Sequence, residues 1–486
     1  MITRQRFPGC FQRRGISCRK KRKELQFLFL EGSFVTDNRT QSEFILNLCE
    51  EYRKNNRIDP ALYNDPEVKR GLRNANGTGV IAGLSQIGDV VGYDLRDGER
   101  VGIPGKLYYR GYDLEDLING FIKEGRYGFE EVSYLLLFGK LPTPAQFKYM
   151  SEQLGILRQL PDFFTEDQIL KSPSPNVMNK MARCTLGLYS FDPSPDDTSL
   201  ENLMRQGMEL IARFPILLAY AYQAKRHFFD HKSLHIHFPH DNQSTAESIL
   251  RAVRSDKQFT AEEARLLDLC LVLHAEHGGG NNSTFACRVV SSSGTDTYAA
   301  ISAALSSLKG PLHGGANIAV MDMFDEIQKN VRNWEDEGEV ADYLAKILRR
   351  EAGDHSGKIY GMGHPIYTVS DPRARILKDN ARMLAEKKGH GDEFRLVELV
   401  ERLTPEVFAK VKGSDKPMCA NVDMYSGFVY KTLDIPVELY TPLFAAARIA
   451  GWIAHRIEEI CGNSRIIRPA YRVVYDTRSY VPMSER

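Results

Sequence analysis

The chain has 486 residues, of which 42% are hydrophobic and 26% are charged. These are ordinary values for a globular protein with roughly two or three domains. No apolar run approaches the ~20 residues that a transmembrane helix needs, which argues against a membrane protein of that kind. The eight cysteines never form a CxxC pair, so they indicate reduced thiols inside a cell rather than a disulfide framework or a zinc site.

Basic residues are concentrated at the start of the chain. Residues 1–23 contain nine Lys or Arg and no acid, and the remainder has 55 basic and 63 acidic residues, a net charge of −8. A body with this charge has no general affinity for nucleic acid, so any anionic ligand must be held by a few focused arginines. Residues 1–38 show no core pattern and are predicted to be a disordered extension of a cytoplasmic protein. The alternative is an Arg-rich presequence, which would direct the chain to the mitochondrial matrix.

Helical patterns dominate the chain from about Gln41 onwards. Residues 44–52 have helical spacing, whereas the glycines and β-branched residues of 69–111 indicate short strands and turns. Further helices are predicted over 112–123, 129–139, 143–157, 176–189, 202–225, 245–253 and 261–277. This succession, with little strand, predicts an all-α architecture.

The motif GPLHGGAN, at residues 310–317, lies between two predicted helices. The helix over 298–309 stops at Gly310 and Pro311, and core spacing resumes from Ile318. His313 is therefore expected in a turn before a helix N-terminus, where the helix field opposes its protonation. A neutral imidazole there can donate a hydrogen bond to a developing oxyanion. Taken alone, a turn histidine that only caps backbone is the commoner case.

Two other histidine clusters allow several interpretations. The segment HAEHGGGNNST, at 274–284, has neither the order of an HExxH zinc site nor an accompanying GxSxG hydrolase elbow. It fits better an anion site at a new helix start, with His277 as a donor. The segment HIHFPH, at 235–240, lacks carboxylate or cysteine partners, so a polar loop is favoured over a metal site.

Later motifs place charged residues at predicted helix starts. Asp371 is expected to be an N-cap, with Pro372 at the first helical position and Arg373 in the first turn. Asp423 begins another predicted helix, and Arg448 lies on the helix that Thr441 and Pro442 open.

Five of these motifs resemble the citrate synthase family: GPLHGGAN, GMGHPIYTVSDPRA, NVDMYSG, FAAARIAGWIAH and the terminal pair RP. They occur in the family's order, and the similarity covers about residues 66–472. The resemblance implies a multi-helical homodimer with a large domain over 39–315 and 428–486 and a small domain over 316–427. It implies no metal and no cofactor, because the coenzyme A thioester is a substrate.

The resemblance also implies a reaction and a set of site residues. The reaction is the condensation of acetyl-CoA with oxaloacetate and water to give citrate and CoA. Matching positions suggest catalytic roles for His313, His364 and Asp423. Substrate-binding roles fall to His277, Arg373, Arg448 and Arg468, the last acting across the dimer.

Some alternatives remain open at this point. A 2-methylcitrate synthase that uses propionyl-CoA would share these residues, because one methylene shifts binding by only ~1–3 kcal/mol. A non-catalytic regulatory relative would be expected to lack the acid–base set, which is present here. Pro365 and Thr368 stand where many family members have basic residues that meet CoA, so the CoA phosphate contacts are not predicted.

Overall fold

The computed structural model describes residues 38–414, 416–462 and 465–486, so the prediction for the first 38 residues falls almost wholly outside the described residues. The chain divides into two compact units. The terminal unit contains the described part of the first 70 residues and residues 471–486. Its helix α2 (Asn38–Asn55) confirms the helix predicted over 44–52, and Arg472 pairs there with Asp65 and Glu67.

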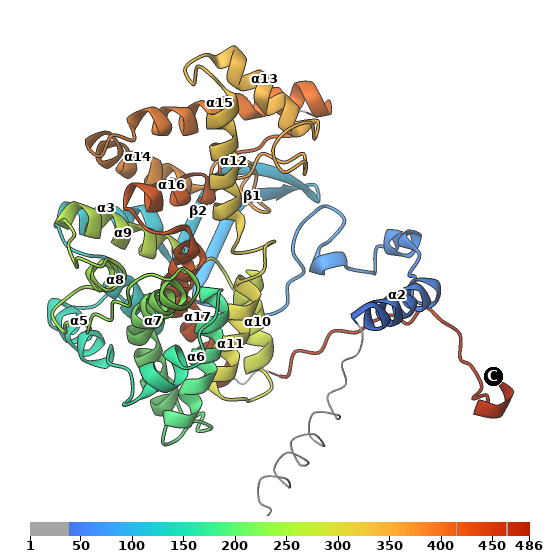
Figure 1. Cartoon of the computed structure of the whole chain (residues 1–486), viewed down its shortest axis with the longest axis horizontal. Helices are drawn as coiled ribbons and strands as arrows, with labels where there is room; N and C mark the ends of the chain where they lie inside the picture. The colour runs from blue at the N-terminus through green and yellow to red at the C-terminus, as the bar shows by residue number, and fades with distance from the viewer. Residues whose placement is uncertain (1–37, 415, 463–464) are drawn as a thin grey trace, which may run out of the picture. The chain divides into compact units, whose positions relative to one another are not determined.

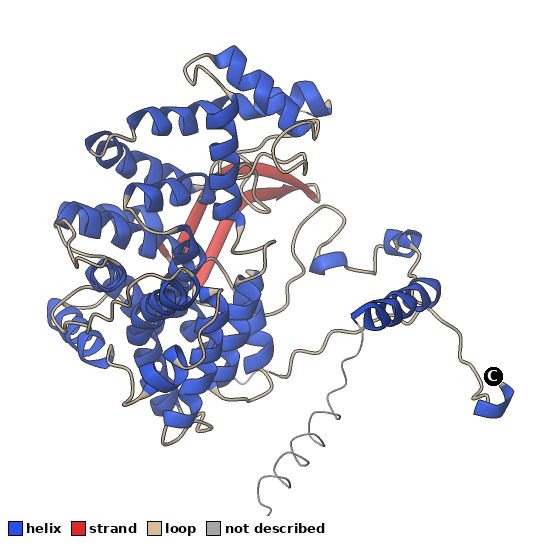
Figure 2. Ribbon diagram, in the orientation of Figure 1, coloured by secondary structure: helices blue, strands red, loops and turns tan. Residues whose placement is uncertain are grey.

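The main unit, Gly71–Ala470, is built around a β-hairpin among helices (Figures 1 and 2). Strands β1 (Gly88–Arg96) and β2 (Glu99–Tyr109) pair antiparallel, and β3 (Tyr112–Asp113) adds a short edge. The register shifts between Val91 and Tyr93, which is a β-bulge that bends the hairpin. These strands fall within or next to the region 69–111, as predicted.

The first group of helices follows the hairpin in the sequence. It consists of α3 (Leu114–Lys123), α4 (Phe129–Phe138), α5 (Pro144–Leu157), α6 (Val177–Gly187), α7 (Leu200–Phe229), α8 (Thr245–Val253), α9 (Ala261–His274), α10 (Asn282–Ser291) and α11 (Thr297–Leu308). Capping boxes fix the starts of α5, α8 and α9. The predicted helices are confirmed to within a few residues at each end.

The C-terminal end of helix α9 differs from its prediction. Helix α9 ends at His274, whereas the periodicity predicted a helix as far as His277. The chain turns away because Glu276 is completely buried and the Tyr109 hydroxyl lies 2.9 Å and 3.1 Å from the carbonyls of Val272 and Glu276. His277 is thereby released from the helix.

The second group of helices lies at the top of Figure 1 and comprises α12 (Ala316–Asn330), α13 (Glu337–Leu348), α14 (Pro372–Lys387), α15 (Gly391–Lys412) and α16 (Asp423–Thr432). Helix α15 packs on α13 and α14, and α16 packs on α12 and α14. The long loop between α13 and α14 carries the GMGHPIY motif. The chain then returns to the first group through α17 (Tyr440–Cys461).

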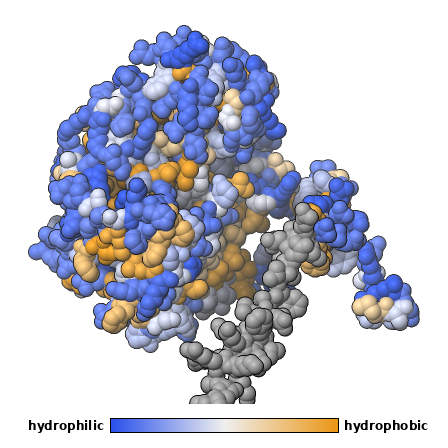
Figure 3. Space-filling model, in the orientation of Figure 1, coloured by the Kyte–Doolittle hydropathy of each residue, from blue (hydrophilic) through white to orange (hydrophobic). Residues whose placement is uncertain are grey.

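Helix α17 is the central helix of the core. It packs against α4, α7, α9, α10 and α11, and its Trp452 is completely buried. The predicted mostly helical fold is confirmed, with the small three-stranded sheet as its β component. No helix in the described part of the chain is long and apolar enough to cross a membrane. Hydrophobic residues at the surface gather in patches on a largely hydrophilic face (Figure 3).

Candidate active site

Hydrogen bonds between two loops bring His364 and Asp423 into one site. The backbone N–H of Asn421 donates to the carbonyl of Gly361 at 2.9 Å. The Asn421 side-chain amide donates to the carbonyl of Gly363 at 2.8 Å. These bonds tie the residue before His364 to the segment that leads into α16, where Asp423 is the first residue.

The β-hairpin supports the His364 loop from the other side. Arg100 donates to the carbonyl of Pro365 at 3.2 Å, and the backbone N–H of Gly105 donates to the Ser370 hydroxyl at 3.1 Å. A Cβ at Gly105 would lie only 2.2 Å from the Ser370 carbonyl oxygen. Glycine is therefore required for this close approach of strand and loop.

Thr368, in the same loop, faces the hairpin. Its hydroxyl is buried without a hydrogen-bond partner, and a Cβ at Gly102 would lie 2.3 Å from it. Pro365 is exposed but has no charge. Neither residue supplies a basic side chain to this loop.

The tautomer of His364 is set by the backbone. The N–H groups of Ile366 and Tyr367 both lie 3.1 Å from His364 Nδ1. Because a backbone N–H can only donate, Nδ1 is the acceptor and Nε2 carries the proton. Burial, with Arg373 nearby, lowers the pKa of His364 to about 4. At neutral pH His364 is therefore an uncharged N–H donor.

His313 lies in the turn before α12, as predicted. Its backbone N–H donates to the Gly310 carbonyl at 2.9 Å, and the next residue's N–H returns to the end of α11. A Cβ at Gly314 would lie 2.3 Å from the Leu308 carbonyl oxygen, so the turn requires glycine. The Thr441 hydroxyl donates to the Gly314 carbonyl at 2.8 Å, which fixes the turn against α17.

Ser283 orients the His313 ring. The Ser283 backbone N–H lies 3.4 Å from His313 Nε2, and its hydroxyl lies 3.0 Å from the same atom. The N–H can only donate, which makes Nε2 the acceptor and leaves the proton of the neutral ring on Nδ1. Burial and the charge of Arg448 lower the pKa of His313 to about 4. His313 is thus a second neutral donor.

Asp423 has the opposite shift. Burial raises its pKa to about 6, against the lowering effect of Arg373 and with a further rise from Asp371. A carboxyl with a pKa near 6 is ionised at neutral pH and is a stronger base than an exposed aspartate. That is suited to proton abstraction.

Arg448 has the most unusual environment in the site. The side chain is completely buried, yet only its Nε has a partner, the His274 carbonyl at 2.6 Å. Both terminal nitrogens, Nη1 and Nη2, are buried without a hydrogen-bond partner. Burial lowers the pKa of Arg448 to about 10, so the guanidinium stays charged at neutral pH. A buried, charged fork with free donors is suited to binding a carboxylate.

Arg373 is held differently. As predicted, Asp371 caps α14 by accepting from the Arg373 backbone N–H at 3.0 Å. The same carboxylate also accepts from Arg373 Nε at 3.0 Å and Nη2 at 2.8 Å. Arg373 is buried, and the Asp371 carboxylate raises its pKa despite that burial. One terminal nitrogen, Nη1, is left outside this pair.

The ring of His277 contacts the His364 loop and lies within the electrostatic influence of Arg373 and Arg448. Its ring centroid lies 5.2 Å from that of His364 and 5.7 Å from that of Tyr367. Burial, followed by the charge of Arg373, lowers the pKa of His277 well below its ordinary value. Its Nε2 is buried without a partner, so the ring offers a free polar atom beside the cationic pocket.

His274 is a site residue that sequence reasoning assigned no role. Its Nδ1 lies 2.8 Å from the Cys270 carbonyl, and its Nε2 is buried and unpartnered. The ring packs on Phe444, which also lies under Arg448 and beside His313. Its spacing of three residues from His277 was visible, but the sequence did not show that α9 ends between them.

A buried network supports the residue next to His277. His455 Nε2 lies 3.0 Å from Glu276 Oε1, and both side chains are completely buried. Arg288 donates to His455 Nδ1 at 2.8 Å, so Nδ1 is an acceptor and the Nε2–H donates to Glu276. A Cβ at Gly451 would lie 2.4 Å from Glu276 Oε2. Glu276 also counters the charge of Arg448.

The structure therefore groups six of the seven predicted site residues, namely His277, His313, His364, Arg373, Asp423 and Arg448, through direct contacts and mutual charge effects. Arg468 lies in the segment after α17 and is exposed. It has no hydrogen bond or ion pair with the residues that the structure describes.

Comparisons with known proteins agree with this geometry. Residues 74–470 match the family described as citrate synthase, C-terminal domain. A citrate synthase of Synechocystis sp. is 35% identical over 430 residues, covering 87% of this chain and 96% of the relative. A 2-methylcitrate synthase of Shewanella oneidensis is 33% identical over 390 residues, covering 79% of this chain and 94% of the relative.

A solved structure shows the same fold. The citrate synthase of the archaeon Thermoplasma acidophilum, in a ternary complex with carboxymethyl coenzyme A and oxaloacetate, matches with a TM-score of 0.69 and 28% identity. The match covers 87% of this chain and 100% of that one. The chain belongs to the citrate synthase family of condensing enzymes.

Proposed function

We propose that the chain condenses acetyl-CoA with oxaloacetate and water to give citrate and CoA. The observation that carries the proposal is the environment of Arg448, a buried cation with two unpartnered nitrogens beside neutral histidine donors. Such a pocket favours a small dianion with a polarisable carbonyl group. Oxaloacetate, which the Thermoplasma relative binds, has that chemistry.

The first step is enolisation of the thioester. Asp423 removes a proton from the acetyl methyl group while His313 Nδ1–H donates to the thioester oxygen, which develops negative charge. The low pKa of His313 keeps this ring neutral, so it acts as a hydrogen-bond donor rather than as a cation. The pKa of Asp423, about 6, reduces the difference between the pKa of this base and that of the weakly acidic methyl group.

The second step forms the carbon–carbon bond. The enol carbon attacks the ketone carbon of oxaloacetate, and the ketone oxygen receives a proton from the direction of His364 Nε2–H. Arg373 and Arg448 hold the two carboxylates and orient the ketone. Water then cleaves the citryl thioester, which releases CoA as a thiol.

We further propose the domain arrangement and the assembly. Residues 316–427 would form a small domain that closes over the substrate against a large domain, bringing Arg373 toward Arg448. Arg468 would complete the site of the partner subunit in a homodimer. Its exposure, and the lack of a hydrogen bond or ion pair between it and the described residues of its own chain, support a role outside that chain.

The acyl preference is the finer part of the proposal. The 2-methylcitrate synthases among the relatives, at 32% and 33% identity, favour propionyl-CoA as a second candidate. Both reactions use the same base and donors and differ by one methylene in the acyl pocket. The citrate synthase relative at 35% identity supports acetyl-CoA as the first candidate.

Release of free thiol tests the proposal. Acetyl-CoA and propionyl-CoA are each incubated with the enzyme, with and without oxaloacetate. Thiol release that requires oxaloacetate, with the larger kcat/KM for acetyl-CoA, is expected. A larger value for propionyl-CoA would assign the second candidate, and release without oxaloacetate would indicate a thioesterase.

A further inference from the structure

A cavity separate from the catalytic site lies between helices that lead into that site. It has a volume of about 490 Å³ and is lined by residues of α3, α9 and α14, including Phe121, Leu266, Leu269 and Leu384. A cavity of this size, with apolar walls and a few charged groups, is typical of small-molecule sites. The catalytic mechanism uses none of its residues.

Some of the basic residues around this cavity have a carboxylate partner and one does not. Arg126 pairs with Glu131 at 2.9 Å, and Lys387 pairs with Glu262 at 2.5 Å. Arg265, by contrast, has no carboxylate partner among the residues that the structure describes, although it lines the same cavity. An anionic group bound there would meet a free guanidinium.

The lining carboxyl Asp268 does not neutralise Arg265. The Asp268 oxygens accept from the backbone N–H groups of Gly128 at 2.6 Å and Phe129 at 3.3 Å, at the start of α4. The carboxyl is buried, and both of its oxygens accept hydrogen bonds from that helix start. The cavity therefore combines an apolar interior with one available cation.

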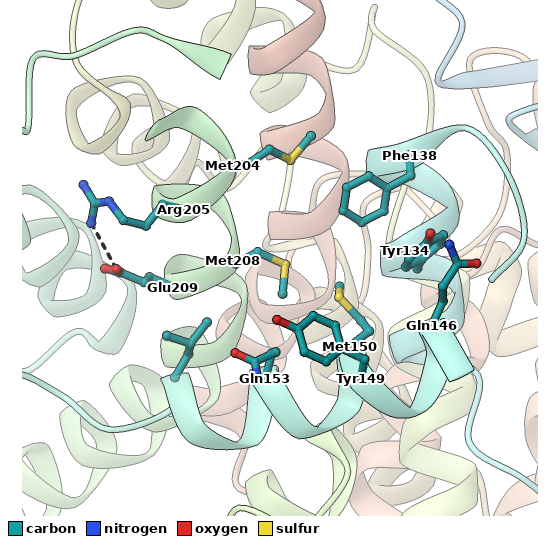
Figure 4. A pocket seen from close by; sticks show the side chains of 11 residues that line it. Tyr134, Phe138, Gln146, Tyr149, Met150, Gln153, Met204, Arg205, Met208 and Glu209 are labelled. Carbon is teal, nitrogen blue, oxygen red and sulfur yellow. Dashed lines mark hydrogen bonds and ion pairs between the residues drawn. The ribbon is translucent and has the colours of Figure 1, made fainter. Parts of the chain in front are cut away.

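A comparable cavity elsewhere lacks this feature. It has a volume of about 480 Å³ and lies between α4, α5 and α7, where Met150, Met204 and Met208 point into it (Figure 4). Its two charged lining residues, Arg205 and Glu209, pair with each other at 3.0 Å. That cavity can hold an uncharged apolar molecule but offers no free cation.

Helices α9 and α14 connect the cavity that contains Arg265 to the catalytic site. They pack against each other (Figure 1), and the Lys387–Glu262 pair joins the end of α14 to the start of α9. At the opposite ends, Arg373 lies in the first turn of α14 and its charge acts on His274, the last residue of α9. The two helices are thus antiparallel, with the cavity at one end and the anion pocket at the other.

We infer that this cavity binds an apolar carboxylate, with the carboxylate on Arg265, and that its occupancy weakens oxaloacetate binding. The regulatory part rests on the proposed function, in which closure brings α14 toward the large domain. A molecule wedged between α9 and α14 stabilises the more open arrangement. By linkage, oxaloacetate must weaken binding of that molecule by the same factor.

The test uses naphthalene-2-carboxylate as the probe and its uncharged amide as the matched ligand. Titration calorimetry on the full chain should show saturable binding of the carboxylate. The variant Arg265→Gln should weaken it about 5-fold or more, because a charge-assisted hydrogen bond is lost. Arg349→Gln, an exposed arginine at the end of α13 and outside the cavity, should bind as the wild type does. Arg265→Lys should restore part of the affinity.

The coupling is measured in the same titrations. Saturating oxaloacetate should raise the Kd of the probe, and saturating probe should raise the Kd of oxaloacetate by an equal factor of about 5 or more. Absence of saturable binding, or equal binding by Arg265→Gln, overturns the site. Equal affinity for the amide also overturns it, since that points to the cavity in Figure 4, whose two charged residues pair with each other.

Failure of the site and failure of the proposed function give different results. Probe binding that depends on Arg265 in an enzyme without condensing activity supports the site and removes the function. Condensing activity without probe binding supports the proposed function and rules out the site. Probe binding that leaves oxaloacetate affinity unchanged removes the regulatory role.

Discussion

Replacement of Arg448 by methionine should make the protein more stable and remove oxaloacetate binding. Four of the five guanidinium N–H donors of Arg448 are on Nη1 and Nη2, which are buried without partners. Replacement of buried ionic groups by apolar side chains of similar size is often neutral or raises the unfolding free energy by ~1–4 kcal/mol. The lost bond to the His274 carbonyl offsets roughly 1 kcal/mol of that gain.

Arg456 provides a matched control on the same helix. It is also buried, but its three nitrogens donate to the Thr297 hydroxyl at 3.0 Å, the Ser291 hydroxyl at 3.1 Å and the Thr295 carbonyl at 2.7 Å. Arg456→Met leaves these acceptors without a donor. We therefore expect it to lower the unfolding free energy by about 1–3 kcal/mol.

Chemical denaturation of both variants, with and without oxaloacetate, measures the difference. Oxaloacetate at about 100 times its Kd should stabilise the wild type by ~2.7 kcal/mol and Arg448→Met not at all. If Arg448→Met loses as much stability as Arg456→Met, or keeps the oxaloacetate effect, then Arg448 is a structural residue and the assignment of the anion pocket is wrong.

Four further predictions concern the residues of the site. The kcat/KM profile should fall below about pH 6 as Asp423 takes up a proton, before His313 protonates near pH 4. A wild-type profile without an inflection near pH 6, or an inflection that does not move in Asp423→Glu, would contradict this. Because the folded pKa of Asp423 lies above 3.8, stability conferred by its protonated form is lost as pH rises through about 6, and Asp423→Asn should remove that loss in denaturation measurements. His313→Ala and Asp423→Ala should each lower kcat by ~10²–10⁴-fold, with no additional loss in the double variant; strictly additive losses would show that they act in separate steps. An inactive Arg468→Ala chain mixed with an inactive His313→Ala chain should recover roughly a quarter of wild-type activity after subunit exchange, because half of the dimers hold one intact site; no recovery, with exchange confirmed by native mass spectrometry, would place Arg468 in its own subunit's site.

Local sequence rules were enough to predict most of the helices and the positions of several site residues. The turn at His313 follows from the glycines around it, and the cap at Asp371 follows from the proline after it. These features depend on residues adjacent in the chain. For that reason, the helix starts that carry Arg373 and Asp423 were predicted correctly.

Features that depend on distant residues were not predictable in this way. The end of α9 at His274 depends on Tyr109 in β2, and the orientation of His313 depends on Ser283. The Glu276–His455 pair joins segments 179 residues apart. No spacing rule shows that Arg448 would be left with two unpartnered nitrogens, because that depends on how the helices pack.

The most direct test of the central claim follows the new carbon–carbon bond. The enzyme is incubated with acetyl-CoA labelled with ¹³C at the methyl carbon, together with oxaloacetate, and the products are observed by NMR. We expect the label in a methylene group of citrate, with one CoA released per citrate and no product from Asp423→Asn. Labelled acetate with unconsumed oxaloacetate would contradict the account, since the site would then only hydrolyse the thioester.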